Sequence, residues 1–478
     1  MTAYSCMSTA ELEREYTQVL EKYNHCKELG LNLNMARGKP AKAQLDLVSD
    51  ILNVLQTPDD CFDGDIDSRN YGELAGLPSA RAYWADVLDC KASQIFVGGA
   101  ASLNMMCDIV SRAFTHGLLH SERPWCREEK VKFLCPSPGY DRHFQIGQFY
   151  GAELITIPML STGPDMDMVE ELVKDPQVKG IWCVPKYSNP QGYTYSEETV
   201  DRFANLKPAA PDFTIMWDNA YCVHEFDGEF EPFRDIISLC AEAGRPNMVY
   251  EFASTSKITF PGSGIAALAT SPNNLEDIIS QLKIQTIGHD KVNQLRHVRY
   301  FGDIHGLMVH MKKHADILRP KFEMVEKILD EEIGGLGIGE WTKPIGGYFV
   351  SFDSLPGCAK AIVKRCKKCG VKMTPAGATW PYGKDPLDTN IRIAPSFPTP
   401  DEMAQAAELQ NKVAAAQEQL ANTNVKGLSS DGMCIIDMTC KYDMTKVIIN
   451  PNIMVSGADA VATAVLSAYQ DAKSKADK

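Results

Sequence analysis

Residues 213–221 read FTIMWDNAY, a short apolar run that ends in a carboxylate, an amide and a phenol. Apolar runs of this length, without regular alternation of polar residues, are typical of strands buried on both faces of a sheet. The stretch MVYEFASTSK, residues 248–257, repeats this arrangement and ends in a lysine. Both stretches therefore predict a buried strand whose carboxyl end presents polar side chains.

Seven runs of this kind lie between residues 95 and 269, and helical patterns separate most of them. This alternation predicts an α/β fold with a mostly parallel, seven-stranded sheet and helices on both of its faces. The predicted strands are Ile95–Val97, Lys132–Cys135, Glu153–Ile157, Gly180–Val184, Phe213–Trp217, Met248–Phe252 and Gly264–Ala269.

The rest of the chain predicts additional parts around this large domain. A long helical stretch at about 290–332 leads into strand patterns at Gly347–Phe352 and Asn390–Ala394, with a helix near Ala359–Cys369 between them. We expect a smaller α+β domain here, which also takes up the N-terminal segment. The predicted parts are residues 1–45 (small domain), 46–304 (large domain), 305–402 (small domain) and 403–478 (appendage).

Composition excludes several classes of function. The 478 residues carry a net charge of −14, and a field of this sign repels nucleic acid and anionic membranes. The N-terminus MTAYSCMSTAELEREY does not resemble a targeting sequence, and no apolar run reaches the roughly 18 residues of a membrane span. The 15 cysteines are scattered, and the one C-x-x-C, at Cys366 and Cys369, lacks a second pair. We expect a cytoplasmic protein without a metal site.

Polar side chains follow three of the predicted strands. Asn189 follows the strand at 180–184, Asp218 ends the strand at 213–217, and Lys257 follows the strand at 248–252. In open α/β sheets, ligands bind beyond the carboxyl ends of the strands. The three side chains are therefore expected to converge on one crevice.

These groups are the ones needed to hold and use pyridoxal phosphate. Lys257 supplies an amine that can form an imine with the cofactor, and Asp218 a carboxylate that keeps the pyridine nitrogen protonated. Asn189 and Tyr221 can donate to the phenolate oxygen of the ring, and Tyr140 can cover the ring with an aromatic face. Each residue alone is more often structural, but the joint pattern predicts the cofactor.

The phosphate of such a cofactor needs backbone N–H groups at the start of a helix. The stretch VGGAASLN, residues 97–104, follows a predicted strand directly and opens a helix. Two serines beside the lysine can add hydroxyl donors. The predicted phosphate ligands are Ala100, Ala101, Ser102, Ser254 and Ser256.

Residues 20 to 400 resemble the fold-type I, class I pyridoxal-phosphate aminotransferases, and in particular an aspartate aminotransferase-like subgroup. The motifs that carry this resemblance include ARGKP, PGYDRHF, NPQG, DNAY, TSKITFPG and PYGKDP. These six stand at Ala36–Pro40, Pro138–Phe144, Asn189–Gly192, Asp218–Tyr221, Thr255–Gly262 and Pro381–Pro386. Two further segments, an SSLN-type one at Ala101–Asn104 and DKVNQLRH at Asp290–His297, complete the set.

The resemblance implies a ping-pong transfer of an amino group, with an acidic donor such as L-aspartate and 2-oxoglutarate as acceptor. Lys257 would move the proton between the substrate Cα and the cofactor. Arg392 would bind the substrate α-carboxylate through two parallel contacts, beside Asn189 and the backbone of Gly38.

The resemblance also implies supporting residues and a partner. His143 would hold Asp218 in place. Tyr71, in RNYGELAG, would reach the phosphate of a neighbouring subunit, so a homodimer with shared active sites is implied.

One position departs from the family pattern. Most class I enzymes carry a phosphate-binding arginine shortly after the lysine, and here the matching place is near Gly264. Lys291 or Arg296 could replace that arginine. The same segment, TIGHDKVNQLRH with Lys291, Asn293 and Arg296, is also the predicted site of substrate side-chain recognition, although an ordinary solvated helix start fits it equally well.

The C-terminal stretch from Lys426 onward resembles the small YbaB-type nucleoid-associated proteins, and the Ala- and Gln-rich helix at Met403–Leu420 could be the first helix of that module. That family forms dimers and binds DNA. Here, however, the stretch has six lysines, no arginine and six aspartates, whereas neutralising phosphate needs a basic surface. We expect a dimerisation or scaffolding appendage rather than a DNA-binding one.

Two alternatives remain open. The chain could be a cofactor-binding regulator whose tail contacts DNA or a partner, although retention of both Lys257 and Arg392 favours an enzyme. It could also prefer aromatic or alanine donors, or catalyse β-decarboxylation, because recognition of the substrate side chain depends on loop geometry.

Overall fold

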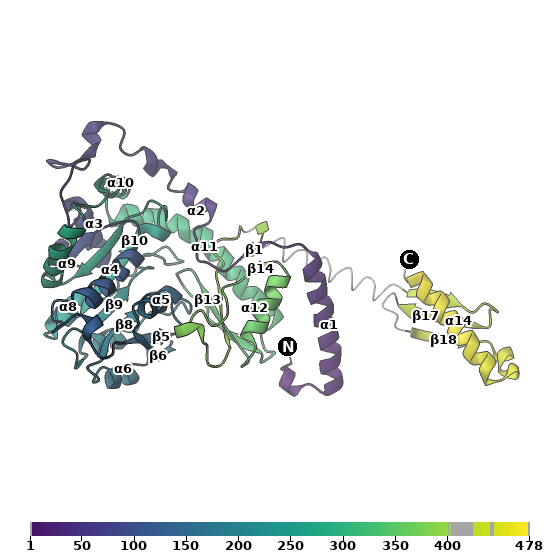
Figure 1. Cartoon of the computed structure of the whole chain (residues 1–478). Helices are drawn as coiled ribbons and strands as arrows, with labels where there is room; N and C mark the ends of the chain where they lie inside the picture. Colours follow the sequence, from purple (N-terminus) through teal and green to yellow (C-terminus); the bar gives the residue numbers. More distant parts are fainter. Residues whose placement is uncertain (1, 400, 403–423, 440–443, 477–478) are drawn as a thin grey trace. The chain divides into compact units, whose positions relative to one another are not determined.

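The computed structural model describes residues 2–399, 401–402, 424–439 and 444–476 (Figure 1). The chain divides into two compact units, Met1–Pro400 and Asp401–Lys478. The predicted boundary after residue 402 borders the segment 403–423, which lies outside the described residues. The division of the first unit into a large and a small domain stays a prediction.

A mostly parallel sheet forms the centre of the first unit, with strand order β4-β11-β10-β9-β8-β5-β6-β7. All seven predicted strands are present, and the two-residue edge strand β7 adds an eighth, antiparallel to β6. Strand β11 runs antiparallel to both of its neighbours. The bounds are β4 (Ile95–Val97), β5 (Lys132–Ser137), β6 (Glu153–Leu160), β7 (Gly163–Pro164), β8 (Val178–Cys183), β9 (Thr214–Asp218), β10 (Val249–Ser254) and β11 (Ala266–Thr270).

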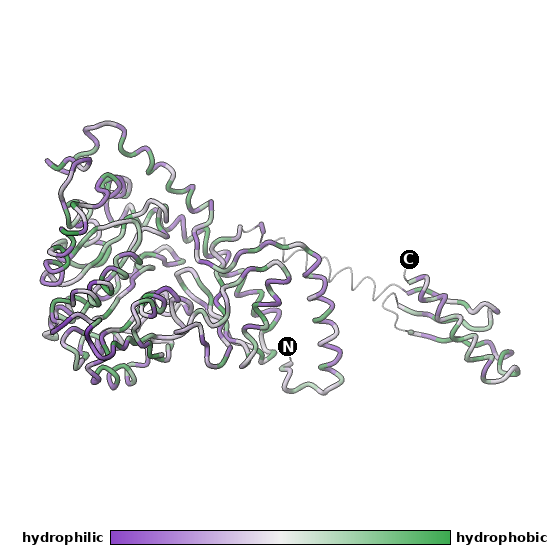
Figure 2. The backbone as a smooth tube through the Cα atoms, in the orientation of Figure 1, coloured by the Kyte–Doolittle hydropathy of each residue, from purple (hydrophilic) through white to green (hydrophobic). Residues whose placement is uncertain are grey.

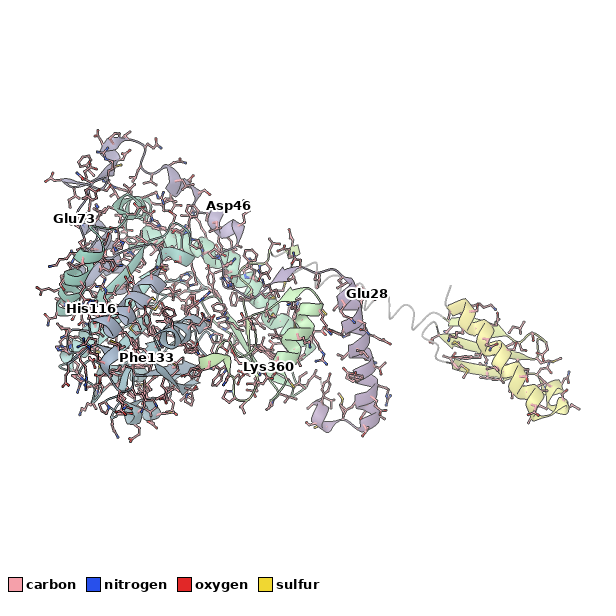
Figure 3. The ribbon with its side chains drawn as sticks, viewed as in Figure 1. Glu28, Asp46, Glu73, His116, Phe133 and Lys360 are labelled. Carbon is pink, nitrogen blue, oxygen red and sulfur yellow. The ribbon has the colours of Figure 1, made fainter. Side chains whose placement is uncertain are left out.

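Helices cover both faces of this sheet because successive side chains of a strand point to opposite faces. In β9, Ile215 and Trp217 join one hydrophobic cluster and Met216 joins the other. Phe133 of β5, labelled in Figure 3, belongs to the second cluster. The first cluster contains residues of α3 (Pro78–Leu88), α6 (Met166–Leu172), α7 (Glu197–Ala204), α8 (Ile236–Glu242) and α10 (Lys291–Phe301), and the second those of α4 (Ser102–Thr115), α5 (Asp141–Phe149) and α9 (Pro272–Gln285).

The long helical stretch predicted at about 290–332 is two helices, α10 and α11 (Ile304–Glu332). Gly302 ends α10 with a φ of 74°, a backbone conformation that glycine adopts without a steric penalty. Asp303 then caps α11 by accepting a hydrogen bond from the Gly306 N–H group. The break follows from a local signal, a glycine before an aspartate, that the apolar pattern alone concealed.

Beyond α11 the chain forms an antiparallel sheet with strand order β12-β13-β15, and the N-terminal segment takes part in a separate two-stranded sheet. Strand β1 pairs in parallel with β14, as expected if the N-terminus returns to the C-terminal part of this unit. The helix α1, opened by a capping box between Ser8 and Glu11, carries both hydrophilic and hydrophobic residues along its length (Figure 2). The bounds are α1 (Thr9–Glu28), β1 (Leu33–Asn34), α2 (Lys42–Asp46), β12 (Gly339–Trp341), β13 (Val350–Ser354), α12 (Ala359–Lys368), β14 (Val371–Lys372) and β15 (Asn390–Ile393).

The second unit packs a helix against a three-stranded antiparallel sheet, β16 (Asn424–Leu428), β17 (Cys434–Thr439) and β18 (Met444–Ile449). Alternate residues of β17 form its core with alanines spaced four apart on α14 (Ala458–Ala476). A side chain at Gly427 would meet the Ala468 carbonyl at 2.1 Å, so α14 packs directly on the strand backbone. The predicted helix at Met403–Leu420 lies outside the described residues.

Among the described helices, none combines the length and the apolar composition that a bilayer span requires.

Candidate functional site

A cavity of about 340 Å³ lies at the carboxyl ends of β8, β9 and β10. The predicted convergence of strand ends on one crevice therefore holds in the fold. The predicted residues that line this cavity are Gly38, Ala101, Ser102, Tyr140, Asn189, Asp218, Tyr221, Ser254, Ser256, Lys257 and Arg392.

Lys257 stands directly after β10, in a single turn of 3₁₀ helix at Thr255–Lys257. Its Nζ lies 4.8 Å from the centre of the Tyr221 ring. Although Lys257 is partly accessible from the cavity, the surrounding protein desolvates the amine and lowers its pKa, an effect that the charge of Asp218 partly opposes. A lowered pKa favours the neutral amine, which is the nucleophilic and basic form.

Asp218 ends β9 and is buried, with one carboxylate oxygen engaged and the other free. His143 Nε2 lies 2.9 Å from Asp218 Oδ2, and the His143 ring stacks on Trp182 at 4.6 Å. Asp218 Oδ1 is buried and has no hydrogen-bond partner among the described residues. A buried acceptor without a donor is costly, so Oδ1 is suited to a donor on a bound molecule.

Two tyrosines with raised phenol pKa values line the cavity. Burial raises the pKa of Tyr140 to about 12, and the charges of Asp218 and Asp141 add to the effect. Burial also raises the pKa of Tyr221 well above its usual value. Both phenols therefore remain hydrogen-bond donors across the neutral pH range.

Arg392, in β15, is fixed on several sides. Its Nη1 donates to Asn189 Oδ1 at 3.1 Å and to Asp141 Oδ1 at 3.2 Å, and its Nη2 donates to Thr374 Oγ1 at 3.3 Å. The guanidinium lies 4.9 Å from the centre of the Phe349 ring. A guanidinium has five N–H donors, and three of them are used in these contacts, so two remain for an incoming carboxylate.

Gly38 lies where no larger residue fits. A side chain there would meet Phe349 Cζ at 2.7 Å. The glycine therefore lets the backbone approach the cavity, as the sequence predicted.

The predicted phosphate ligands divide into two groups. Ala101 is the N-cap of α4 and lines the cavity with Ser102, so free N–H groups of a helix start face it. Ala100 does not line the cavity, and its carbonyl accepts a hydrogen bond from Ser256 Oγ at 3.3 Å. Ser254 Oγ lies 3.1 Å from Ser256 Oγ.

Close packing explains the missing arginine near Gly264. A side chain at this position would meet Thr255 Oγ1 at 2.8 Å and the Phe260 carbonyl at 3.3 Å. No arginine side chain could leave the backbone here without moving this loop.

The structure does not bring Lys291, Asn293 and Arg296 to the cavity, because none of the three is among its lining residues. Asn293 Nδ2 donates to the Gly264 carbonyl at 2.8 Å, and Arg296 Nη2 donates to Ser263 Oγ at 2.9 Å. Asn293 and Arg296 therefore anchor the loop before β11. Their predicted contact with substrate, like that of the buried Lys291, stays a prediction.

Tyr71 also stays outside this cavity, with 81% of its side chain exposed. Its predicted contact with a neighbouring subunit stays a prediction. Across the described ranges, no cluster of three or more His, Cys, Asp or Glu side chains has the arrangement of a metal site.

Sequence reasoning missed several residues that line the cavity or hold Arg392. Arg37 and Lys39 flank Gly38 in the ARGKP motif, and Asp141 and Arg142 follow Tyr140 in PGYDRHF. Both motifs had been singled out, so their charged members could have been considered. Thr374, which bonds Arg392, carried no comparable signal.

A chain of buried polar side chains lies behind Lys257. Tyr348 Oη donates to the Lys257 carbonyl at 3.3 Å and accepts from Gln44 Nε2 at 2.9 Å. Gln44 Nε2 also lies 3.0 Å from His314 Nδ1, and His314 Nε2 lies 3.0 Å from His310 Nε2. His310 Nε2 returns to the carbonyl of the residue after Lys257, at 2.9 Å. Two consecutive carbonyls at the lysine are thus held by one network.

Comparison with known proteins identifies relatives over both units. Residues 7–426 match the family described as aspartate amino-transferase, and residues 399–478 match the YbaB/EbfC DNA-binding family. An aspartate aminotransferase from Corynebacterium glutamicum is 42% identical over 416 residues, which cover 85% of this chain and 96% of that protein.

Solved structures agree with these sequence matches. The crystal structure of an aspartate transaminase from Corynebacterium glutamicum superposes with a TM-score of 0.82 at 42% identity, covering 86% of this chain and 98% of that one. An α-aminoadipate aminotransferase from Thermus thermophilus, solved with N-(5′-phosphopyridoxyl)-L-leucine, shares the fold at a TM-score of 0.64 and 18% identity, covering 81% of this chain and 93% of that one.

Proposed function

The chain belongs to the aspartate aminotransferase family, and on that premise we propose that it transfers the amino group of L-aspartate to 2-oxoglutarate by a ping-pong reaction. It is a pyridoxal-phosphate-dependent aminotransferase; the substrate pair, the order of steps and the residue roles are the proposal. One observation carries it: a desolvated amine, a half-engaged carboxylate and a guanidinium with spare donors line the same cavity.

The residues at the cavity fit the cofactor of this family. A protonated pyridine nitrogen needs a carboxylate acceptor, and Asp218 Oδ1 is a buried acceptor without a donor among the described residues. When bound, pyridoxal phosphate supplies a conjugated ring that withdraws electrons from the bond being broken. Lys257 would hold it covalently through Nζ, and Asn189 and Tyr221 would donate to the ring oxygen.

Further residues would hold the ring and the phosphate. Tyr140 would cover the ring, and His143 would keep Asp218 oriented through the contact at Oδ2. The phosphate would be bound by N–H groups at the start of α4 and by serine hydroxyls rather than by an arginine near Gly264, where close packing leaves no space. These phosphate ligands would be Ala101, Ser102, Ser254 and Ser256.

Lys257 would carry the proton in the reaction. Because desolvation lowers the pKa of its amine, Nζ can accept a proton from the substrate Cα near neutral pH and return it in the reverse half-reaction. Asp218 would stabilise the positive charge needed for electron withdrawal.

Arg392 supports the ping-pong order. An amino acid and a 2-oxo acid share the α-carboxylate, and one guanidinium with two unused donors can bind either of them in turn. A single cavity with one such clamp and one proton carrier suits two half-reactions in sequence.

We also propose the assembly and setting that the family implies. Tyr71 would reach the phosphate of a second subunit in a homodimer, for which its exposed phenol is suited. The chain would act in the cytoplasm. The second unit would serve dimerisation or scaffolding, because its near-neutral charge favours neither DNA nor an anionic surface.

The test is a single half-reaction on the full chain loaded with pyridoxal phosphate. L-aspartate added without any 2-oxo acid should change the absorption of the bound cofactor and release one oxaloacetate per active site. 2-Oxoglutarate should then restore the original spectrum. A change that requires both substrates together would contradict the ping-pong order, and reaction with alanine or aromatic donors in preference to aspartate would replace the proposed donor.

A further inference from the structure

Three basic side chains border the cavity in addition to Lys257 and Arg392. Arg37, Lys39 and Arg142 all line it, and all three are exposed. In the described part of the chain none of them forms an ion pair. Three cations gathered around one cavity, in a chain with a net charge of −14, make the potential there locally positive, which suits an anionic ligand.

Both arginines leave the backbone beside groups that bind the Arg392 guanidinium. Arg142 follows Asp141, whose Oδ1 accepts from Arg392 Nη1 at 3.2 Å. Arg37 follows Ala36, whose carbonyl accepts from Thr374 Oγ1 at 2.5 Å. The same Thr374 Oγ1 accepts from Arg392 Nη2 at 3.3 Å. The two chain segments are thus held to the two ends of one guanidinium.

The backbone at both arginines is well defined although their side chains are exposed. Gly38, next to Arg37, packs against Phe349, and the Lys39 N–H group donates to the Arg37 carbonyl at 2.8 Å. Arg142 lies in the first turn of α5, and its Nη1 donates to Gln145 Oε1 at 2.9 Å. That neutral amide leaves the charge of Arg142 uncompensated.

Lys39 is a weaker candidate than the two arginines. Its Nζ lies 5.8 Å from the centre of the Phe397 ring, so part of its charge is engaged by an aromatic face. A lysine also lacks the planar pair of donors that binds a carboxylate at two points.

Arg392 accounts for only one carboxylate of a substrate. We propose that Arg37 and Arg142 form a second subsite, which binds the distal carboxylate of a dicarboxylic amino acid or 2-oxo acid. The inference rests on the proposed function, because it takes this cavity as the substrate site. In this proposal the substrate side chain is recognised by Arg37 and Arg142 beside Arg392, and not by the segment at 291–296.

The test measures binding without turnover. The full chain loaded with pyridoxal phosphate is titrated by calorimetry with succinate, which has two carboxylates, and with butyrate, which has one. Succinate should bind more tightly than butyrate. Arg37→Leu and Arg142→Leu should each weaken succinate binding by about ten- to a hundredfold and leave butyrate binding unchanged.

Two further variants serve as controls. Arg365→Leu removes an exposed arginine of α12, away from the cavity lining, and should alter neither affinity. Arg142→Lys keeps the charge without the planar donors and should retain part of the preference for succinate.

Several results would overturn the subsite. One is equal affinity for succinate and butyrate in the unaltered chain, and another is an equal loss of affinity for both ligands in the variants. A third is a lower affinity of the variants for pyridoxal phosphate, which would assign the arginines to binding of its phosphate. Failure of the proposed function looks different: aspartate would leave the cofactor spectrum unchanged while the arginine-dependent preference for succinate persisted.

Discussion

At the scale of single residues, the free oxygen of Asp218 is the most telling feature of the site. One oxygen faces His143 and the other has no donor among the described residues, although both are buried. A buried charge that is only half satisfied destabilises the empty protein. Such a group is retained where a ligand completes it, so the cost in stability is offset by the bound cofactor.

Asp218→Asn should separate binding from catalysis. The amide keeps the size of the side chain but removes the negative charge that would hold the cofactor ring protonated. We expect kcat/KM for the transamination to fall by about a hundredfold or more. Steady-state kinetics on cofactor-saturated enzyme measure this, and a loss of less than tenfold would show that the charge of Asp218 is dispensable.

The lowered pKa of Lys257 predicts a pH dependence of stability in the cofactor-free protein. Between the lowered pKa and the ordinary value of 10.5, the unfolded chain binds the proton that the folded chain has lost. The stability contributed by this residue therefore rises with pH across that window. Lys257→Met should remove this contribution to the dependence of the free energy of unfolding on pH.

Urea unfolding of the cofactor-free protein and of Lys257→Met, at several pH values from neutral upward, measures the difference. The difference in free energy of unfolding between the two proteins should become smaller as the pH rises, because the folded protein accommodates the neutral amine better than the charged one. Parallel stability curves would mean that the folded amine titrates as an ordinary lysine.

At the scale of elements, the ends of two strands place Asp218 and Lys257 at the cavity, and helices behind the strands fix the backbone at the lysine. Strands β9 and β10 end at Asp218 and just before Lys257, so two reactive groups arise from consecutive strands of one parallel pair. Helices α2 and α11 then reach the backbone at Lys257 through Gln44 and His310. The lysine is thus fixed from elements that never enter the cavity.

Tyr348→Phe tests this support. The change removes only the hydroxyl that bonds the Lys257 carbonyl, so the backbone at the lysine should loosen while the packing stays. The same hydroxyl also accepts a hydrogen bond from Gln44, so the change removes two hydrogen bonds. We expect kcat to fall about fivefold or more, because the lysine is held less firmly in position, with little change in KM.

Tyr16→Phe, an exposed phenol on α1, is the matched control and should leave kcat unchanged. The pH profile of kcat should also shift for Tyr348→Phe, because the lysine environment changes. A reduced melting temperature with unaltered kcat and unaltered pH profile would make Tyr348 purely structural.

At the scale of the whole molecule, the chain joins an enzyme unit to a small second unit with a core of its own. The cavity and all the proposed cofactor and substrate residues lie in the first unit. The second unit therefore need not take part in the chemistry. Its exposed apolar residues on β18, Met444, Val447 and Ile448, are suited to assembly.

Removal of residues 424–478 should change the oligomeric state and leave the transamination rate within about twofold, since the cavity-lining residues remain intact. Light scattering and steady-state kinetics on the shortened and full chains measure both effects. A large loss of activity would mean that the second unit contributes to the active site.

Much of the fold and of the candidate site was predictable because the signals are local. Each strand is a short apolar run, and Asn189, Asp218 and Lys257 stand just beyond three of them. A local signal, glycines directly after a strand, also placed the start of α4.

The sequence by itself thus determined the sheet and the groups that meet at its edge. The reason is that the pattern that predicts a strand and the polar residues at its end are adjacent in the chain. Only the tertiary structure decided which charges border the cavity. Asn293 and Arg296 do not line it and anchor the loop before β11, whereas Asp141 binds Arg392 across 251 positions of the chain. Such pairings depend on long-range packing, because the sequence around each of these residues does not indicate which distant residue it will contact.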